Sequence, residues 1–352
     1  MHSGLLPERE HRGISNVSTV VVSGAAGMVG SHVTELLVAR GDHVVGVDNL
    51  LTGDLANLAS VVGSDRFEFV ECCASELPSL PDRTTAVLHL GSPASPRHFR
   101  DLPMEVLRAG STATLHLLDL AERAGATFLF ASSSEVYGEP LVHPQPEDYR
   151  GNVSTLGERA CYDEAKRFSE AAVDTYRLRR GLDTRIARIF NTYGPRMRLD
   201  DGRIVVTFAQ QALTGAPLTV HGDGFQTRSY CYVDDLASGI LALLDSDVGV
   251  PVNLGSTEEH TVLGVARLVL RLTGSESEVK FVDRPENDPS RRRPDLTRAK
   301  DMLDWEPTVG LDEGMRRTIE SIAAQVGVEL PADARIGSGS SAAVDSHRAV
   351  QP

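Results

Sequence analysis

The stretch VVVSGAAGMVGSH, residues 20–32, decides the fold class of this chain. It joins an apolar run typical of a buried strand to three glycines, Gly24, Gly27 and Gly30, which stand where a helix is expected to begin. Glycines at this spacing permit a tight turn and let backbone amides at the positive end of a helix approach a pyrophosphate. A strand–helix turn without any ligand can carry the same glycines, so the motif has to be judged by its context.

An acidic residue, Asp48, stands after the glycine motif where a dinucleotide site is expected to have one. A second apolar run, HVVGVD at residues 43–48, ends in Asp48, whose carboxylate can accept a hydrogen bond from a ribose hydroxyl and repel a 2′-phosphate. The residues that follow, DNLLTGDL, contain no arginine to bind such a phosphate. The two runs together predict a dinucleotide site that prefers NAD to NADP.

Strand-like and helix-like segments alternate through the first half of the chain. Further short apolar runs are FEFV (67–70), AVLHL (86–90), TFLFAS (127–132) and TRIARI (184–189), and helical periodicity covers about 28–40, 104–124 and 159–180. This alternation predicts an α/β fold with a Rossmann-type, doubly wound parallel sheet. We expect an NAD-binding domain over residues 17–190, joined by some later segments, and a smaller substrate-binding α/β part over 191–330. Residues 1–16 and 331–352 are expected to be disordered.

Composition excludes several classes of partner. The 352 residues carry a formal net charge of −14, which argues against nucleic acid or an anionic membrane as a general partner. No apolar run is long enough to span a bilayer, and the N-terminus does not resemble a signal peptide. The four cysteines lack CxxC spacing, so we expect reduced thiols, a cytoplasmic protein and no metal site.

A tyrosine and a lysine in ACYDEAKR, residues 160–167, form a candidate acid/base pair. Tyr162 and Lys166 are four residues apart on a predicted helix and therefore share one face. A phenol with a pKa of about 10 is a poor base at neutral pH, but a nearby ammonium and an oxidised nicotinamide would favour the phenolate. Such a pair is more often an ordinary surface pair, and the nucleotide motif upstream favours the catalytic interpretation.

Three hydroxyls and a carboxylate follow the apolar run TFLFA. In an open parallel sheet, ligands bind outside the carboxyl ends of the strands, so residues 132–135 are expected to reach the nicotinamide. Alternation along an extended chain places Ser133 and Glu135 on one side, where Ser133 can share a hydrogen bond with Tyr162 and a substrate oxygen. Helix capping would explain one of the serines but not Glu135.

These motifs resemble the extended short-chain dehydrogenase/reductase family, and within it the nucleotide-sugar enzymes that decarboxylate UDP-glucuronate. The likeness runs from about Val20 to Thr318. It is carried by HLGSPASP (89–96), ASSSEVYGEPLVHPQPEDY (131–149), GERACYDEAKR (157–167), RIARIFNTYGPRMRLDDGRIV (185–205), PLTVHGDGFQTRSYCYVDDL (217–236), PVNLGSTEEHT (251–261), DPSRRRPD (288–295) and LDWEP (303–307).

The resemblance implies conversion of UDP-glucuronate to UDP-xylose by transient oxidation at carbon 4, loss of carbon dioxide and return of the hydride. Ser134 separates this reaction from that of the related 4,6-dehydratases, which resemble TDEVYG here and use an acid before the glutamate. A 4,6-dehydratase or 4-epimerase remains an alternative function. So does an NAD-binding regulatory protein without catalysis, because a fold does not fix a function.

The resemblance also assigns roles to individual residues. The implied catalytic set is Ser133, Glu135, Tyr162, Lys166 and Arg292, although the run of three arginines leaves the register of Arg292 open by one position. The implied NAD contacts are Gly24, Gly27, Met28, Val29, Gly30, Asp48, Asn49, Thr52, Gly53, Leu90, Ser92, Tyr162 and Lys166. The implied substrate contacts are Arg108, Ser134, Glu135, Asn191, Arg203, His221, Arg228 and Arg292. A homodimer is implied as well, formed by the helices that include residues 104–124 and 159–180.

Overall fold

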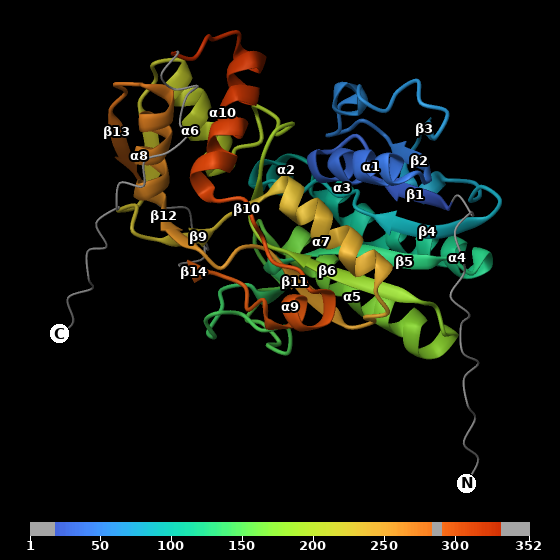
Figure 1. The fold of residues 1–352 in the computed structure, drawn as a ribbon. Coiled ribbons are helices and arrows are strands. Elements are labelled where there is room, and N and C mark those ends of the chain that lie inside the picture. Colours follow the sequence, from blue (N-terminus) through green and yellow to red (C-terminus); the bar gives the residue numbers. More distant parts are fainter. Residues whose placement is uncertain (1–17, 284–290, 332–352) are drawn as a thin grey trace.

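A seven-stranded parallel sheet forms the centre of the larger part of the molecule (Figure 1). The computed structural model describes residues 18–283 and 291–331. The strand order is β11-β6-β5-β4-β1-β2-β3, so the chain winds outward in both directions from the neighbouring pair β1 and β4. The strands are β1 (Thr19–Ser23), β2 (His43–Asp48), β3 (Phe67–Glu71), β4 (Thr84–His89), β5 (Thr127–Ser133), β6 (Thr184–Ile189) and β11 (Pro251–Leu254). The predicted doubly wound α/β fold is confirmed.

Helices cover both faces of this sheet because alternate strand residues point to opposite sides. Val20 and Val22 pack against helices α1 (Met28–Arg40) and α7 (Val233–Asp245). Val21, between them, packs on the other side with helices α4 (Thr114–Ala124) and α5 (Ala160–Arg180). Burial on both faces explains why the strand segments are almost continuously apolar.

Close contact between two helical segments holds α5 in place over the sheet. Residues 103–124 form one helical stretch made of α3 (Pro103–Arg108), a π-helical turn η3 (Ala109–Ala113) and α4. A Cβ added to Gly110 would lie 2.6 Å from the Cβ of Ala165, so only glycine permits this approach. Ser169 adds a hydrogen bond from its hydroxyl to the carbonyl of Gly110 at 2.6 Å. This packing fixes the helix that carries Tyr162 and Lys166.

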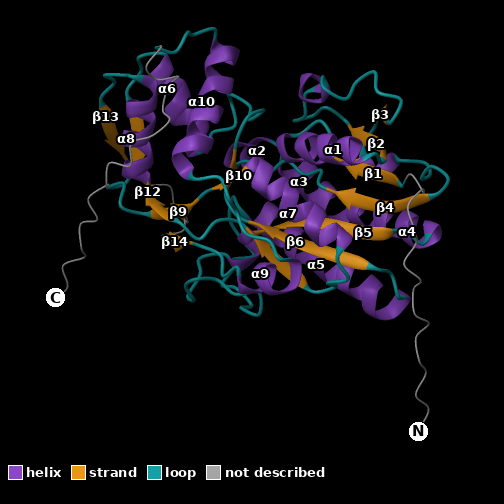
Figure 2. Ribbon diagram, viewed as in Figure 1, coloured by secondary structure: helices purple, strands orange, loops and turns teal. Residues whose placement is uncertain are grey.

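A smaller part sits beyond the carboxyl ends of the central strands (Figure 2). Its core packs α6 (Ile204–Leu213), α8 (Val262–Thr273) and α10 (Leu311–Val326) against β8 (Leu218–His221) and β13 (Val279–Val282). Two further small sheets join β12 (Glu259–Thr261), β9 (Thr227–Ser229) and β14 (Arg291–Arg292), and β10 (Cys231–Tyr232) with β7 (Thr192–Tyr193).

The remaining elements are short. They are η1 (Leu55–Leu58), η2 (Ala74–Glu76), α2 (Pro96–Asp101), η4 (Ser134–Tyr137) and α9 (Thr297–Leu303). Within the two described ranges, no helix combines the length and the apolar character needed to cross a membrane. The division near residue 190 stays a prediction, and the predicted disordered ends, 1–16 and 331–352, lie outside the described residues except for Pro331.

Candidate active site

A cavity of about 430 Å³ opens between the carboxyl ends of the sheet strands and the smaller part. Most of the residues singled out in the sequence line it. They are Gly24, Gly27, Met28, Val29, Gly30, Thr52, Leu90, Ser92, Ser133, Ser134, Glu135, Tyr162, Lys166, Asn191, Arg203, His221, Arg228 and Arg292. The structure therefore brings the predicted nucleotide motif, acid/base pair and substrate-facing arginines to one place.

The glycine turn suits a pyrophosphate. Helix α1 begins at Gly27 with no side-chain cap and no acidic residue in its first turn, so its first amides have no competing carboxylate. A Cβ on Gly27 would meet only the carbonyl oxygen of Gly24, at 3.3 Å, which leaves the rest of its surroundings open to a ligand. The carboxylate of Asp48 accepts hydrogen bonds from the amides of Ala26 at 3.0 Å and Leu50 at 2.9 Å. These residues fit a dinucleotide such as NAD.

Gly30 is required for a different reason, which gives a first prediction. A Cβ on Gly30 would lie 2.0 Å from the backbone oxygen of Gly24, which cannot move without breaking the turn. We expect Gly30→Ala to lower the free energy of unfolding by about 2–3 kcal/mol even without ligand. Gly27→Ala should fold normally and lose at least about tenfold in NAD affinity. Thermal unfolding with and without NAD separates the two effects, and wild-type stability in Gly30→Ala would contradict this assignment.

Tyr162, Ser133 and Lys166 meet at the end of strand β5. The Tyr162 hydroxyl shares a hydrogen bond with Ser133, which also accepts from the amide of Glu135 at 3.2 Å. The ammonium of Lys166 donates to the carbonyl oxygen of Ala131 at 2.7 Å and lies 5.5 Å from the centre of the Tyr162 ring. All three side chains are buried, so the geometry is that of an acid/base group held by a hydroxyl and a nearby amine.

Burial dominates the electrostatics of this group. Burial raises the pKa of Tyr162 to about 12, and the hydrogen bond from Ser133 opposes this only in part. Burial also lowers the pKa of Lys166 to about 7 against the attraction of Glu170. In the chain without NAD, burial therefore penalises both the phenolate and the ammonium, and the predicted preference for the phenolate beside an oxidised nicotinamide stays a prediction.

Glu135 is buried between two arginines. Arg292 donates from Nη2 to Oε2 of Glu135 at 2.9 Å and from Nη1 to Oε1, and Arg159 Nη2 lies 2.6 Å from Oε2. Burial alone would raise the pKa of Glu135, but Arg292 and Arg159 bring it down to about 2. The neighbours of Arg292 point elsewhere, since Arg291 is exposed and Arg293 pairs with Glu259 at 3.5 Å. Of the three arginines in this run, Arg292 is the one that lines the cavity, and its contact with the substrate stays a prediction.

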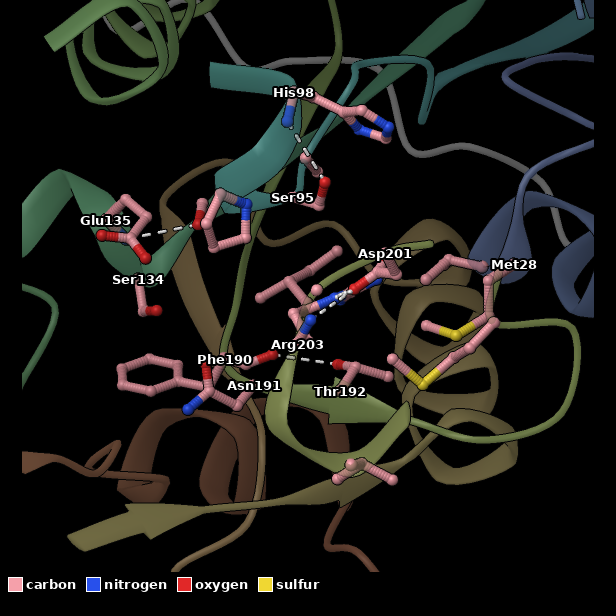
Figure 3. Close-up of a pocket in the computed structure, with 18 of the residues that line it drawn as sticks. Met28, Ser95, His98, Ser134, Glu135, Phe190, Asn191, Thr192, Asp201 and Arg203 are labelled. Carbon is pink, nitrogen blue, oxygen red and sulfur yellow. Dashed lines mark hydrogen bonds and ion pairs between the residues drawn. The ribbon is translucent and has the colours of Figure 1, made fainter. Parts of the chain in front are cut away.

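The cavity is lined by further polar groups, of which Figure 3 labels Asn191 and Arg203. Arg203 is held by Asp201, with Nη2 donating to Oδ2 at 2.8 Å. His221 contacts the backbone oxygen of Asp283 through Nδ1 at 3.0 Å. Buried Arg228 donates to the carbonyl of Thr227 at 2.8 Å. Together with Asn191, these side chains offer mainly hydrogen-bond donors, as an anionic ligand requires.

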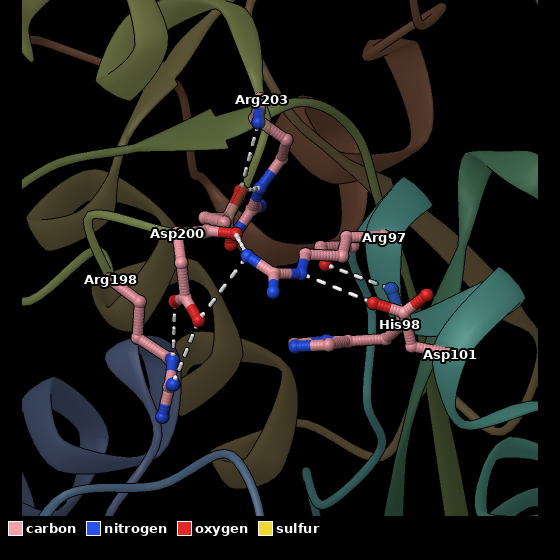
Figure 4. Close-up of polar contacts among 8 residues, drawn as sticks. Arg97, His98, Asp101, Arg198, Asp200 and Arg203 are labelled. Atoms are coloured by element: carbon pink, nitrogen blue, oxygen red, sulfur yellow. Dashed lines mark hydrogen bonds and ion pairs between the residues drawn. The ribbon is translucent and has the colours of Figure 1, made fainter.

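One edge of the cavity is bridged by ion pairs between the two parts of the molecule (Figure 4). Arg97 of helix α2 binds Asp101 at 3.1 Å and reaches Asp200, which precedes α6, at 3.6 Å. Asp200 also accepts from Arg198 at 2.9 Å. These side chains are about half exposed, so we assign them a modest contribution to stability.

Four of the predicted contact residues are not among those that line the cavity. Asp48 is the last residue of strand β2. Asn49 and Gly53 lie in the loop that follows, which reaches the cavity through Thr52. The side chain of Arg108 is 67% exposed, lies 3.9 Å from Glu105 and does not line the cavity, so its contact with the substrate stays a prediction.

The sequence analysis missed several residues that line the site. Arg159 lies in the motif GERACYDEAKR but was assigned no role. Its position three residues before Tyr162 was the feature that could have indicated a place in the site. Phe99 stacks on the Tyr162 ring at 4.5 Å between centroids, and nothing in its sequence context indicates this contact. Among the described residues, no group of three His, Cys, Asp or Glu side chains could hold a metal ion.

Comparisons with known proteins agree on the family. The chain is 46% identical over 300 residues to UDP-glucuronic acid decarboxylase 1 of Xenopus tropicalis, covering 85% of this chain and 71% of that protein. It is 42% identical to UDP-glucuronic acid decarboxylase 5 of Arabidopsis thaliana, covering 92% of this chain and 94% of that protein.

Solved structures of related enzymes match over similar lengths. The UDP-glucuronic acid 4-epimerase of Bacillus cereus, in complex with UDP-glucuronic acid and NAD, has a TM-score of 0.79 at 26% identity, covering 87% of this chain and 99% of that one. The UDP-glucose 4-epimerase of Thermotoga maritima has a TM-score of 0.81 at 29% identity, covering 88% and 99%. Residues 20–255 match the sequence profile of the NAD dependent epimerase/dehydratase family, and the chain belongs to that family.

Proposed function

We propose that the protein is an NAD-dependent UDP-glucuronate decarboxylase that produces UDP-xylose and carbon dioxide. The observation that carries the proposal is the pair of arginines, Arg159 and Arg292, set around Glu135 beside Tyr162. A sugar with a carboxylate at carbon 6 gives these guanidiniums a partner of the right charge and geometry. The decarboxylases that share up to 46% identity with this chain support the same substrate and reaction.

The first step needs a base for the sugar 4-hydroxyl. NAD held by the glycine turn would supply the hydride acceptor for carbon 4 and the hydride that is returned. Tyr162 takes the proton of the 4-hydroxyl onto its phenolate oxygen. The hydrogen bond with Ser133 stabilises the phenolate. The positive charge of the oxidised nicotinamide would oppose the effect of burial on the Tyr162 pKa.

The second step follows from the position of the ketone. A ketone at carbon 4 is β to the carboxylate, so the carbon–carbon bond can break with the electron pair collecting on the 4-oxygen. Tyr162 and Ser133 are placed to stabilise that oxyanion by hydrogen bonding. A proton then adds to carbon 5. Ser134 is buried on the cavity wall and is a poor acid, which favours this course over dehydration by a 4,6-dehydratase.

The test is product analysis. Purified protein incubated with UDP-glucuronate and NAD should yield a UDP-pentose lighter by one carbon dioxide, with no net NADH. Accumulation of a released 4-keto pentose with stoichiometric NADH would mean oxidative decarboxylation without hydride return. If UDP-glucuronate stays unchanged in mass, the decarboxylase proposal is wrong.

A 4-epimerase is the second candidate, favoured by the fold match to UDP-glucuronic acid 4-epimerase. An epimerase would convert UDP-glucuronate to UDP-galacturonate, which has the same mass but a different chromatographic retention. The same assay therefore separates the two functions. No turnover of any UDP- or dTDP-hexose, with NAD still bound, would favour the regulatory alternative.

We also propose that the protein is a homodimer in a reducing compartment, the cytoplasm. Large apolar side chains are exposed on α3, α4 and α5, namely Met104, Leu107, Leu115, Phe168 and Leu178, where a second copy could cover them. The four cysteines are all free thiols, as expected in the cytoplasm. Light scattering should give twice the chain mass for the wild type and a monomer for Phe168→Glu. A monomeric wild type would exclude the dimer.

A further inference from the structure

Asp163, next to Tyr162 in helix α5, is a buried carboxyl group that the proposed mechanism does not use. It is 7% exposed, and its Oδ1 has no hydrogen-bond partner among the described residues. An ionised carboxylate without partners is costly to bury, so a residue of this kind calls for a specific explanation.

The ordinary explanation is an acidic residue that stabilises the N-terminus of a helix. Asp163 does lie in the first turn of α5. That role requires an ionised carboxylate near the first free amides and normally near solvent. Asp163 is instead buried with Oδ1 unsatisfied, so the helix-end explanation does not account for its surroundings.

The charged groups around Asp163 come from three elements. Glu135 belongs to η4 and Arg292 to β14. Glu164 lies near the start of α5, and Arg159 directly precedes that helix. Glu135, Arg159 and Arg292 are joined by ion pairs and line the cavity, whereas Asp163 is not among the residues that line it. Burial, followed by repulsion from Glu135, raises the pKa of Asp163 to about 7.

The charge of this cluster depends on Asp163. With Asp163 neutral, the two guanidiniums exceed the single carboxylate of Glu135 by one positive charge. With Asp163 ionised, the cluster is neutral overall and has no excess charge to offer an anion. The protonation state of Asp163 therefore sets the net charge of the cluster, although Asp163 does not itself line the cavity. This net charge can determine which ligands the cavity binds.

We propose that Asp163 is a positioning residue that, as a neutral carboxyl group, leaves Arg159 and Arg292 with one uncompensated positive charge for the carboxylate of the sugar. The inference rests on the proposed function, since it takes UDP-glucuronate as the ligand. Asp163 thereby favours a sugar acid over the corresponding hexose. Because the bound carboxylate adds a negative charge near Asp163, binding favours its protonated form and takes up a proton.

The test measures that proton by calorimetry at pH 7.5 in buffers with different heats of ionisation. The NAD-loaded Tyr162→Phe protein is titrated with UDP-glucuronate, so that no turnover contributes heat. Binding should take up about half a proton or more per site. Adding Asp163→Asn should abolish most of this uptake, whereas Glu164→Gln, which removes a charge from the neighbouring, more exposed position, should preserve it. UDP-glucose, which lacks the carboxylate, should show little uptake with any variant.

Kinetics provide a second readout with Tyr162 intact. The KM of the wild type for UDP-glucuronate should rise several-fold between pH 6 and pH 8.5, and that of Asp163→Asn should stay nearly constant.

Asp163 should also make the stability of the folded protein depend on pH. A carboxyl group whose pKa is raised on folding costs stability as pH rises from about 4 to about 7, so Asp163→Asn should gain stability relative to the wild type over that interval.

The outcomes distinguish this inference from the proposed function. Decarboxylation by the wild type, together with identical proton uptake by Tyr162→Phe and by Tyr162→Phe with Asp163→Asn, would overturn the role of Asp163 and leave the decarboxylase intact. Asp163-dependent binding of UDP-glucuronate without carbon dioxide release would support the charge control and refute the decarboxylase. No binding of UDP-glucuronate at all would overturn both. If Asp163→Asn fails to fold, Asp163→Ala takes its place in the Tyr162→Phe background, and uptake equal to that of Tyr162→Phe alone would overturn the role of Asp163.

Discussion

Tyr162→Phe should lower kcat by about a thousandfold while changing the affinity for UDP-glucuronate by less than about threefold. The loss follows because, in the proposed mechanism, the phenolate oxygen takes the proton of the 4-hydroxyl and then helps to stabilise the 4-oxyanion, and proton transfer of this kind contributes about 10²–10⁴-fold. The ring itself should stay in place, since it is buried and stacked on Phe99. Steady-state kinetics together with ligand titration measure the two quantities separately.

A matched control for this variant is Tyr176→Phe in the same helix. Tyr176 donates a hydrogen bond to Asp119 at 2.5 Å and lies far from the cavity lining, so its hydroxyl should not affect turnover. Residual activity of Tyr162→Phe within tenfold of the wild type would show that another group removes the proton.

Arg292→Gln should have the second largest effect, raising the KM for UDP-glucuronate by about a hundredfold, because truncating one member of a buried charge pair costs about 2–5 kcal/mol. Arg292 is 5% exposed and forms a two-pronged ion pair with Glu135. Its loss also removes the strongest influence that lowers the pKa of Glu135. We therefore expect this pKa to rise, with a loss of activity at acidic pH that the wild type does not show.

Two comparisons make the Arg292 result specific. Arg291→Gln changes the exposed neighbour in the same run and should leave KM unchanged. Binding of UDP alone should weaken much less than binding of UDP-glucuronate if Arg292 faces the sugar carboxylate. An equal loss for both ligands would instead place Arg292 at the diphosphate.

Local patterns sufficed to predict the fold and most of the cavity. Gly24, Gly27 and Gly30 follow an apolar run at the spacing of a strand–turn–helix, and the apolar runs form strands buried on both faces. Ser133 could be placed at the ligand site because parallel strands deliver their carboxyl ends to one edge. These inferences depend on short-range geometry, which the sequence encodes directly.

Long-range packing was harder to predict. The contact of Arg159 with Glu135 depends on how α5 docks against η4, and Phe99 reaches Tyr162 through the angle of α2. The outward direction of Arg108 depends on helical phase, which a motif match does not specify. The rise in the Tyr162 pKa caused by burial could not be predicted either, because the sequence indicates a nearby lysine but not the extent of burial.

The most direct test of the central claim is the conversion of UDP-glucuronate in heavy water by the NAD-loaded enzyme, with the product examined by NMR. Transient oxidation with return of the hydride predicts UDP-xylose carrying one deuterium at carbon 5 and none at carbon 4, with no net change in NADH. Deuterium at carbon 4, or a UDP-pentose without deuterium at carbon 5, would contradict the account.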